Sequence, residues 1–142
     1  MSTKIVVDTN VFIGALIGRQ GTANREVLRK CLQKKYQPLM GNSLFAEYCE
    51  VMNREDIKQK CPLSSDQQAD LLRDFLAVCQ WVKVFYLWRP NLSDESDNHL
   101  IELAVAGNAQ IIVTRNIKDL NKSQLLFPQL RILKPEEIIP IN

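Results

Sequence analysis

Short apolar runs in this chain are separated by longer stretches in which apolar residues recur every three or four positions. The runs are rich in β-branched residues, and most are bounded by polar residues or by glycine. Runs of this length and composition predict strands that are buried on both faces, as in a parallel sheet. We therefore expect strands at residues 4–8, 37–40, 81–87, 110–114 and 131–133.

The stretches between these strands have the spacing of amphipathic helices. Their limits are marked by Ser, Thr and Asn, which accept hydrogen bonds in a first helical turn, and by glycine, which ends a last turn. We expect a helix from Thr22, one capped by Asn42 or Ser43, one opened by a capping box at Ser65–Gln68, one from Ser96 to Gly107, and a helical turn at Pro135.

Strands that alternate with helices predict a parallel sheet covered by helices on both faces and joined by right-handed crossovers. The expected fold class is α/β: a three-layer α/β/α sandwich with a central parallel sheet of four to five strands, Rossmann-like in its layers. The chain has 142 residues and contains neither internal repeats nor a long linker. One core is sufficient at this length, so we expect a single domain over residues 1–142.

Acidic residues lie close to the ends of several expected strands. Asp8 ends the first strand, Glu47 lies one turn into the helix after the second, Asp97 begins the helix before the fourth, and Asn116 and Asp119 follow the fourth. Ligands of parallel sheets bind beyond the carboxyl ends of the strands, so these residues can reach the same rim. Converging carboxylates repel one another unless a cation neutralises them, and oxygen ligands favour Mg²⁺ or Mn²⁺. The pattern predicts a divalent metal site suited to phosphodiester hydrolysis by metal-activated water.

Four segments, taken in this order, resemble the motifs of PIN-domain nucleases, especially the VapC-like toxins of type II toxin–antitoxin pairs. They are Ile5–Ile13 (IVVDTNVFI), Ser43–Glu47 (SLFAE), Ser96–Ala104 (SDNHLIELA) and Ile112–Leu120 (IVTRNIKDL). The resemblance spans essentially the whole chain and implies a PIN-like fold. It also implies an endoribonuclease that cleaves RNA with one or two Mg²⁺ or Mn²⁺ ions and that is blocked by a cognate protein antitoxin.

The resemblance assigns roles to individual residues. It implies that Asp8, Glu47 and Asp97 coordinate the metal, and that Asn10 and Thr114 orient these ligands through hydrogen bonds.

The fourth acidic position of the family departs from the usual pattern, because Asn116 stands where many relatives carry Asp. Asp119 either supplies the missing charge, usually through water, or caps the next helix, and the sequence leaves both interpretations open. We expect the loop acid Asp94 to be hydrated rather than to bind metal. His99, the only histidine, is expected to point elsewhere on its helix and is assigned no catalytic role.

Two other functions are considered. A degenerate PIN-like module could bind RNA or protein without cutting, because Asn116 replaces an acid. A phosphoaspartate receiver or phosphatase also places an Asp after its first strand, but it normally has a lysine after a late strand. Here Lys4 precedes the first strand and Arg115 follows Thr114, so we favour the nuclease.

Composition adds little to this assignment. The net charge of +2 does not by itself identify a nucleic-acid binder, although residues 19–35 carry six cations and the single acid Glu26. That segment either meets phosphates or forms a solvated helix face. The cysteines are expected to be buried, reduced thiols, since they lack the spacing of a zinc site; they are Cys31, Cys49, Cys61 and Cys79.

The apolar and aromatic residues of the chain indicate its location and its assembly. Its longest apolar stretch is far shorter than the roughly 20 residues of a membrane-spanning helix, and its first residues lack a secretory signal, so we expect a soluble cytoplasmic protein. Trp81, Phe85, Tyr86 and Trp88 either stack on bases or, as we favour, pack in the core or at a subunit interface. A strand with large apolar groups on both faces favours a homodimer or a higher oligomer.

Overall fold

The computed structural model describes residues 2–18, 22–84, 98–120, 127 and 129–139, apart from the side chains of residues 98, 118 and 119. Within this part of the chain, five parallel strands form a sheet in the order β3-β2-β1-β4-β5. They are β1 (Thr3–Val7), β2 (Tyr36–Met40), β3 (Gln80–Trp81), β4 (Ile111–Val113) and β5 (Arg131–Leu133).

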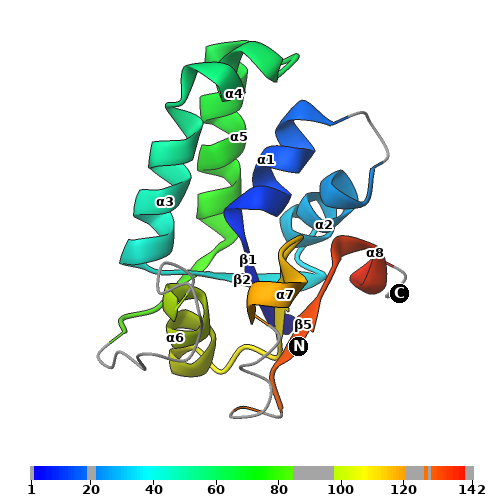
Figure 1. Cartoon of the computed structure of the whole chain (residues 1–142), viewed down its shortest axis with the longest axis vertical. Coiled ribbons are helices and arrows are strands. Elements are labelled where there is room, and N and C mark those ends of the chain that lie inside the picture. The colour runs from blue at the N-terminus through cyan, green and yellow to red at the C-terminus, as the bar shows by residue number, and fades with distance from the viewer. Residues whose placement is uncertain (1, 19–21, 85–97, 121–126, 128, 140–142) are drawn as a thin grey trace.

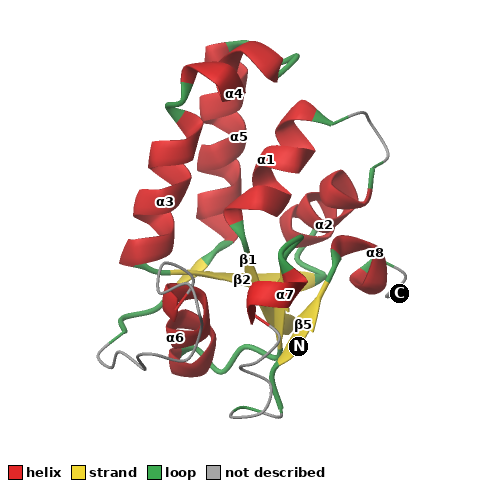
Figure 2. Ribbon diagram, viewed as in Figure 1, coloured by secondary structure: helices red, strands yellow, loops and turns green. Residues whose placement is uncertain are grey.

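Helices cover both faces of the sheet, which makes the fold the expected α/β sandwich. Figures 1 and 2 show α1, α3 and α5 on one side of the sheet and α6 on the other. Within the described ranges, none of the helices has the length and apolar character needed to cross a membrane. The helices are α1 (Thr9–Ile17), α2 (Ala23–Leu32), α3 (Asn42–Met52), α4 (Glu55–Lys60), α5 (Ser65–Val78), α6 (Asn98–Ala106), α7 (Ile117–Leu120) and α8 (Pro135–Ile138).

The core of the molecule fixes α1 between its neighbours. The Phe12 ring packs against Tyr48 of α3 and Phe75 of α5, with ring centroids 5.1 and 5.5 Å apart. Tyr48 is itself fully buried, and its hydroxyl donates a 2.7 Å hydrogen bond to the carbonyl oxygen of Val7. The first turn of α1 and the end of β1 are therefore held in place by the same aromatic cluster.

The register of the sheet brings two polar residues side by side. Val7 of β1 pairs with Val113 of β4, and the backbone N–H of Asp8 donates to the carbonyl oxygen of Val113 at 3.0 Å. Both strands run in the same direction, so Asp8 and Thr114 leave the sheet together at its carboxyl edge. This juxtaposition depends on pairing between segments that are more than a hundred residues apart.

Most expected elements are present, and the exceptions have physical causes. The apolar pattern does not predict α1, because six of its nine residues are buried and no polar stripe marks its period. It also does not predict α4, which has no buried residue and therefore no apolar stripe. The third strand, expected at 81–87, is Gln80–Trp81, and residues 85–87 lie outside the described part of the chain.

The helix ends correct two expectations and confirm a third. Gly41 rather than Asn42 or Ser43 is the N-cap of α3, without a side-chain capping bond. The capping box of α5 uses Ser64 and Gln67, one residue before the expected frame. The helix α6 ends at Ala106 as expected, with Asn108 taking the left-handed conformation at φ 58°. The expected cap Ser96 lies outside the described residues.

The cysteines are free thiols, as expected, and two of them, Cys31 and Cys61, are buried while the other two are partly exposed. Burial raises the pKa of the Cys79 thiol to about 12. Trp81 is 49% exposed at the edge strand β3, and its ring meets Phe45 edge-on at 5.4 Å. The other aromatic residues of the expected interface, Phe85, Tyr86 and Trp88, lie outside the described residues.

Candidate active site

Asp8 is buried at the carboxyl end of β1, with 5% of its surface exposed. It occupies the N-cap position of α1, but its side chain makes no capping hydrogen bond. The carboxylate is therefore available for other contacts. Its Oδ2 atom accepts a 2.8 Å hydrogen bond from the Thr114 hydroxyl and a 3.3 Å bond from the Asn10 amide. Burial raises the pKa of Asp8, and the charge of Glu47 raises it further, whereas the bond from Thr114 lowers it.

Glu47 reaches the same place from α3. The Thr9 hydroxyl donates a 2.6 Å hydrogen bond to Glu47 Oε1 and also lies 3.3 Å from Asp8 Oδ1. A hydroxyl has a single proton to donate, so the shorter contact with Glu47 is the stronger bond. The two carboxylates therefore converge on one hydroxyl group, from helices α1 and α3 that pack against each other.

His99 contacts Glu47, contrary to the expectation from the sequence. Its Nε2 atom lies 2.7 Å from Glu47 Oε2, and only 13% of its side chain is exposed. This bond is the main cause that lowers the pKa of Glu47, while partial burial opposes it and the bond from Thr9 adds to it. The expectation that His99 points elsewhere is thus wrong. The spacing of residues along one helix does not predict a contact between α3 and α6. The position of the only histidine beside the acidic motif at Asp97 is the sequence feature that could have indicated this contact.

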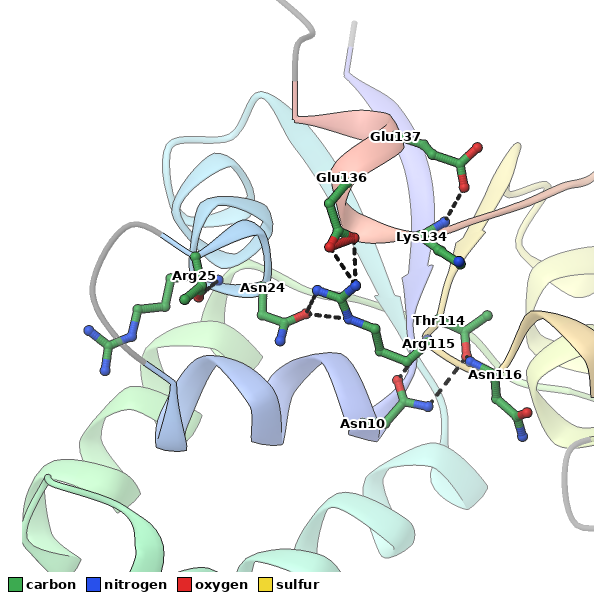
Figure 3. A network of polar contacts seen from close by, with 10 residues as sticks. Asn10, Asn24, Arg25, Thr114, Arg115, Asn116, Lys134, Glu136 and Glu137 are labelled. Atoms are coloured by element: carbon green, nitrogen blue, oxygen red, sulfur yellow. Dashed lines mark hydrogen bonds and ion pairs between the residues drawn. The ribbon is translucent and has the colours of Figure 1, made fainter.

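A polar network completes the rim around Asp8. The Thr114 hydroxyl, which is fully buried, donates to Asp8 and accepts from the Asn116 backbone N–H at 2.9 Å. The Asn10 amide nitrogen lies 3.4 Å from the same hydroxyl, and its Oδ1 accepts from the Arg115 backbone N–H at 3.1 Å. Figure 3 shows Asn10 and Thr114 turned toward each other across this gap. Asn10 and Thr114 thus make the contacts expected of residues that orient a carboxylate.

These features agree with the comparisons with known proteins. A family model described as PIN domain matches residues 4–118. The chain belongs to the PIN-domain family. Among solved structures, this PIN domain resembles "VapBC2 from Rickettsia felis bound to a DNA fragment from their promoter", with a TM-score of 0.58 and 17% identity. That likeness covers 93% of this chain and 98% of the other, and at this identity it supports the fold. No curated protein matches the chain.

The structure describes only part of the predicted acidic site of this PIN domain. Asp8 and Glu47 are brought together, whereas Asp97 and Asp94 lie outside the described residues. Asp119 belongs to α7, and its side chain is also outside them. Among the described residues, no group of three or more His, Cys, Asp or Glu side chains could hold a metal ion.

The described donor set nevertheless fits a hard divalent cation. In the described part of the chain, every hydrogen bond that the Asp8 carboxylate accepts comes from a neutral group, Thr9, Asn10 or Thr114. A buried carboxylate beside a second carboxylate is unfavourable in its charged form unless positive charge is supplied. Carboxylate oxygens are the ligands that Mg²⁺ and Mn²⁺ prefer. Asp8 and Glu47 of the PIN domain are therefore suited to share such an ion.

Two hollows flank the pair formed by Glu47 and His99. One, of about 520 Å³, is lined by Thr9, Asn10 and Glu47 and extends to Arg54. The other, of about 640 Å³, is lined by His99 and by the first turn of α3 around Ser43. Glu47 thus lines one hollow and His99 lines the other.

Proposed function

We propose that this PIN-domain protein is a Mg²⁺- or Mn²⁺-dependent endoribonuclease that hydrolyses RNA phosphodiester bonds, and that it is the toxin of a toxin–antitoxin pair. One observation carries the proposal: the carboxylates of Asp8 and Glu47 converge on the Thr9 hydroxyl at the carboxyl edge of the sheet. Family membership over residues 4–118 supports nuclease chemistry at that place. We also propose that the protein is soluble and acts in the cytoplasm.

In this proposal Asp8, Glu47 and Asp97 hold the ion, and Asp119 contributes through water. The bound ion would lower the pKa of a water molecule and offset the charge that develops on the phosphate oxygens.

The described side chains have defined tasks in such a site. Thr114 and Asn10 both bond to Asp8 Oδ2, which restrains the rotation of this carboxylate and sets the direction of Oδ1. Thr9 and His99 each bond to a different oxygen of Glu47, so this carboxylate is restrained from two sides. A carboxylate oxygen has a second lone pair, so these bonds leave both groups able to bind a cation. Preorganised ligands need little rearrangement when substrate arrives.

The proposed partners are a protein antitoxin and a further copy of this chain. The likeness to the VapBC2 structure supports a protein antitoxin as a partner of this chain. We propose that this antitoxin covers the acidic rim. We also propose a homodimer or higher oligomer, supported by the half-exposed Trp81 on the edge strand β3. A monomeric mass from light scattering at micromolar concentration would contradict the second point.

The central experiment is RNA cleavage by the purified protein. We expect cleavage of single-stranded RNA with Mg²⁺ or Mn²⁺, none in EDTA, and products bearing 5′-phosphates as left by an activated water. Asp8→Asn, Glu47→Gln and Asp97→Asn should abolish cleavage, whereas Asp70→Asn, an acid paired with Arg73 on the exposed face of α5, should retain it. Full activity in the first three variants would refute the proposal.

The same experiment distinguishes the nuclease from a module that binds RNA without cleaving it. Such a module would bind RNA with strong salt dependence but would show no metal-dependent turnover. RNA affinity measured in parallel with cleavage, with and without EDTA, distinguishes the two functions.

A further inference from the structure

The side chain of Arg115 is held by residues from two separate helices. Its Nη1 atom donates to both carboxylate oxygens of Glu136 on α8, at 2.5 and 2.6 Å. Its Nε and Nη2 atoms both donate to Asn24 Oδ1 on α2, at 3.1 and 2.9 Å. Figure 3 shows the guanidinium group enclosed between these two side chains, pointing away from Asn116.

The backbone of the same residue leads to the acidic site. The Arg115 N–H donates to Asn10 Oδ1 at 3.1 Å, and the Asn10 amide donates to Asp8 Oδ2 at 3.3 Å. A continuous series of contacts therefore runs from Glu136 through Arg115 and Asn10 to Asp8. Because Asn10 presents its oxygen to Arg115, its amide nitrogen is directed toward Asp8 and Thr114.

The anchors at the far end are themselves fixed. Ile138 of α8 is buried, and its carbonyl oxygen accepts a 2.7 Å hydrogen bond from the buried hydroxyl of Tyr36 on β2. On α1, a Cβ atom added at Gly14 would overlap the Asn24 amide nitrogen and lie 2.9 Å from its Cγ, so Asn24 occupies space that only glycine leaves free. Glu136 and Asn24, which together form a clamp on Arg115, therefore belong to helices that are anchored to the core.

Stability alone is a weak explanation for this arrangement. The side chains of Arg115 and Glu136 are 35% and 54% exposed, and ion pairs with this exposure contribute little to folding. The positive charge of Arg115 is also directed at Glu136, which makes it a poor cation for a distant phosphate. The four hydrogen bonds of the Arg115 guanidinium instead fix the position of the backbone that follows β4.

We propose that Arg115 is a positioning residue of the active site, held by Glu136 and Asn24 so that its backbone N–H orients Asn10 and thereby Asp8. Its effect on catalysis rests on the nuclease function proposed above, whereas its effect on Asn10 does not. Glu136 lies beyond residue 118, where the family match ends, so this positioning uses a part of the chain outside the matched PIN domain.

Three variants test the proposal, with two matched controls. Arg115→Met keeps the length of the side chain and removes its donors, while Glu136→Gln and Asn24→Ala weaken the clamp from either side. The controls are Glu137→Gln, which keeps its capping oxygen on the same helix, and Arg73→Ala, which breaks an exposed ion pair elsewhere. Thermal unfolding confirms that each variant is folded, and Arg115→Lys tests partial rescue.

The first measurement is independent of activity. We expect the side-chain amide signals of Asn10, identified by their loss in Asn10→Ala, to shift toward solvent-exposed values in the three variants and to stay unchanged in the controls. We also expect weaker Mn²⁺ binding, followed by electron paramagnetic resonance, in Arg115→Met. An Asn10 signal that is the same in wild type and Arg115→Met would overturn the proposal.

The second measurement separates positioning from substrate binding. We expect kcat to fall by about 10- to 100-fold in Arg115→Met, as for other residues that orient metal ligands, with KM changed by less than about threefold. A raised KM with unchanged kcat would instead mean that Arg115 binds substrate, which also overturns the proposal. If no variant and no wild-type protein cleaves RNA, the nuclease assignment fails while the Asn10 signals still decide the positioning role.

Discussion

His99 Nε2 lies 2.7 Å from Glu47 Oε2, which joins α6 to α3 at the edge of the acidic site. The opposite oxygen of Glu47 accepts a 2.6 Å hydrogen bond from Thr9. Glu47 is therefore held from two sides by groups that come from different helices. The orientation of this carboxylate is a property of the assembled fold, and it can be disturbed from either side without removing the acid itself.

Replacing His99 should reduce activity through Glu47. We expect His99→Ala to lower kcat by about tenfold, the smaller end of the range for residues that orient metal ligands. His99→Gln, which carries a donor at a similar reach, should recover most of that loss. Steady-state kinetics on one RNA substrate measure both, and equal activity of His99→Ala and wild type would show that Thr9 alone suffices to orient Glu47.

Replacing Thr9 tests the other side of Glu47. Thr9→Val keeps the shape of the side chain but removes the hydroxyl that both carboxylates approach. We expect a loss of activity of about tenfold or more, with little change in melting temperature, while Thr9→Ser keeps activity. A folded Thr9→Val protein with wild-type kcat would contradict a role for this hydroxyl.

Neutralising Asp8 should separate stability from activity. Burial and the charge of Glu47 raise the pKa of Asp8, so its charged form is costly in the metal-free fold. We expect Asp8→Asn to unfold at the same or a higher temperature than wild type in EDTA, yet to lose activity by at least about 100-fold, corresponding to about 3 kcal/mol in the barrier. A large drop in melting temperature would show instead that the carboxylate stabilises the fold.

Tyr48 provides a test of the core beneath the site. Its buried hydroxyl donates to the carbonyl oxygen of Val7, next to Asp8. We expect Tyr48→Phe to reduce the free energy of unfolding by about 1–2 kcal/mol, as for other buried hydrogen bonds that lose one partner. Urea denaturation followed by circular dichroism measures this change, and an increase in stability would contradict the importance of the bond.

The ion pair of Arg115 and Glu136 predicts a pH dependence. The hydrogen bond from Arg115 is the main cause that lowers the pKa of Glu136 in the folded state. A carboxyl group with a lowered folded pKa stabilises the protein above its unfolded pKa, and this contribution is lost as the pH falls through the folded pKa. We expect wild type to melt slightly above Glu136→Gln at neutral pH and the two to converge in acid. A difference that persists at acidic pH would contradict this account.

Much of the fold could be predicted from local pattern. Four of the strands, and the helices expected from residues 22, 42 or 43, 65 and 96, follow from apolar runs, helical spacing and capping residues, with ends displaced by a residue or two. The third strand was expected at 81–87 but ends at Trp81, and the described residues 82–84 are not part of it. The pattern does not predict α1 or α4. Most residues of α1 are buried and no residue of α4 is fully buried, so neither helix shows an apolar stripe beside a polar one. Asp8 at the end of β1 and Glu47 in α3 approach the same Thr9 hydroxyl, as expected for residues near the carboxyl edge of a parallel sheet. Their role as metal ligands stays a prediction.

The sequence alone determined the succession of strands and of most helices along the chain, the family motifs and the identity of the acids near the strand ends. These are local properties, set by residue type and by spacing within a dozen positions. Only the tertiary structure decided that His99 meets Glu47, that Thr9 lies between two carboxylates, and that Arg115 is held by Asn24 and Glu136. Those contacts join segments far apart in the chain, and their geometry depends on strand register and on how helices pack across the sheet, which no local spacing encodes.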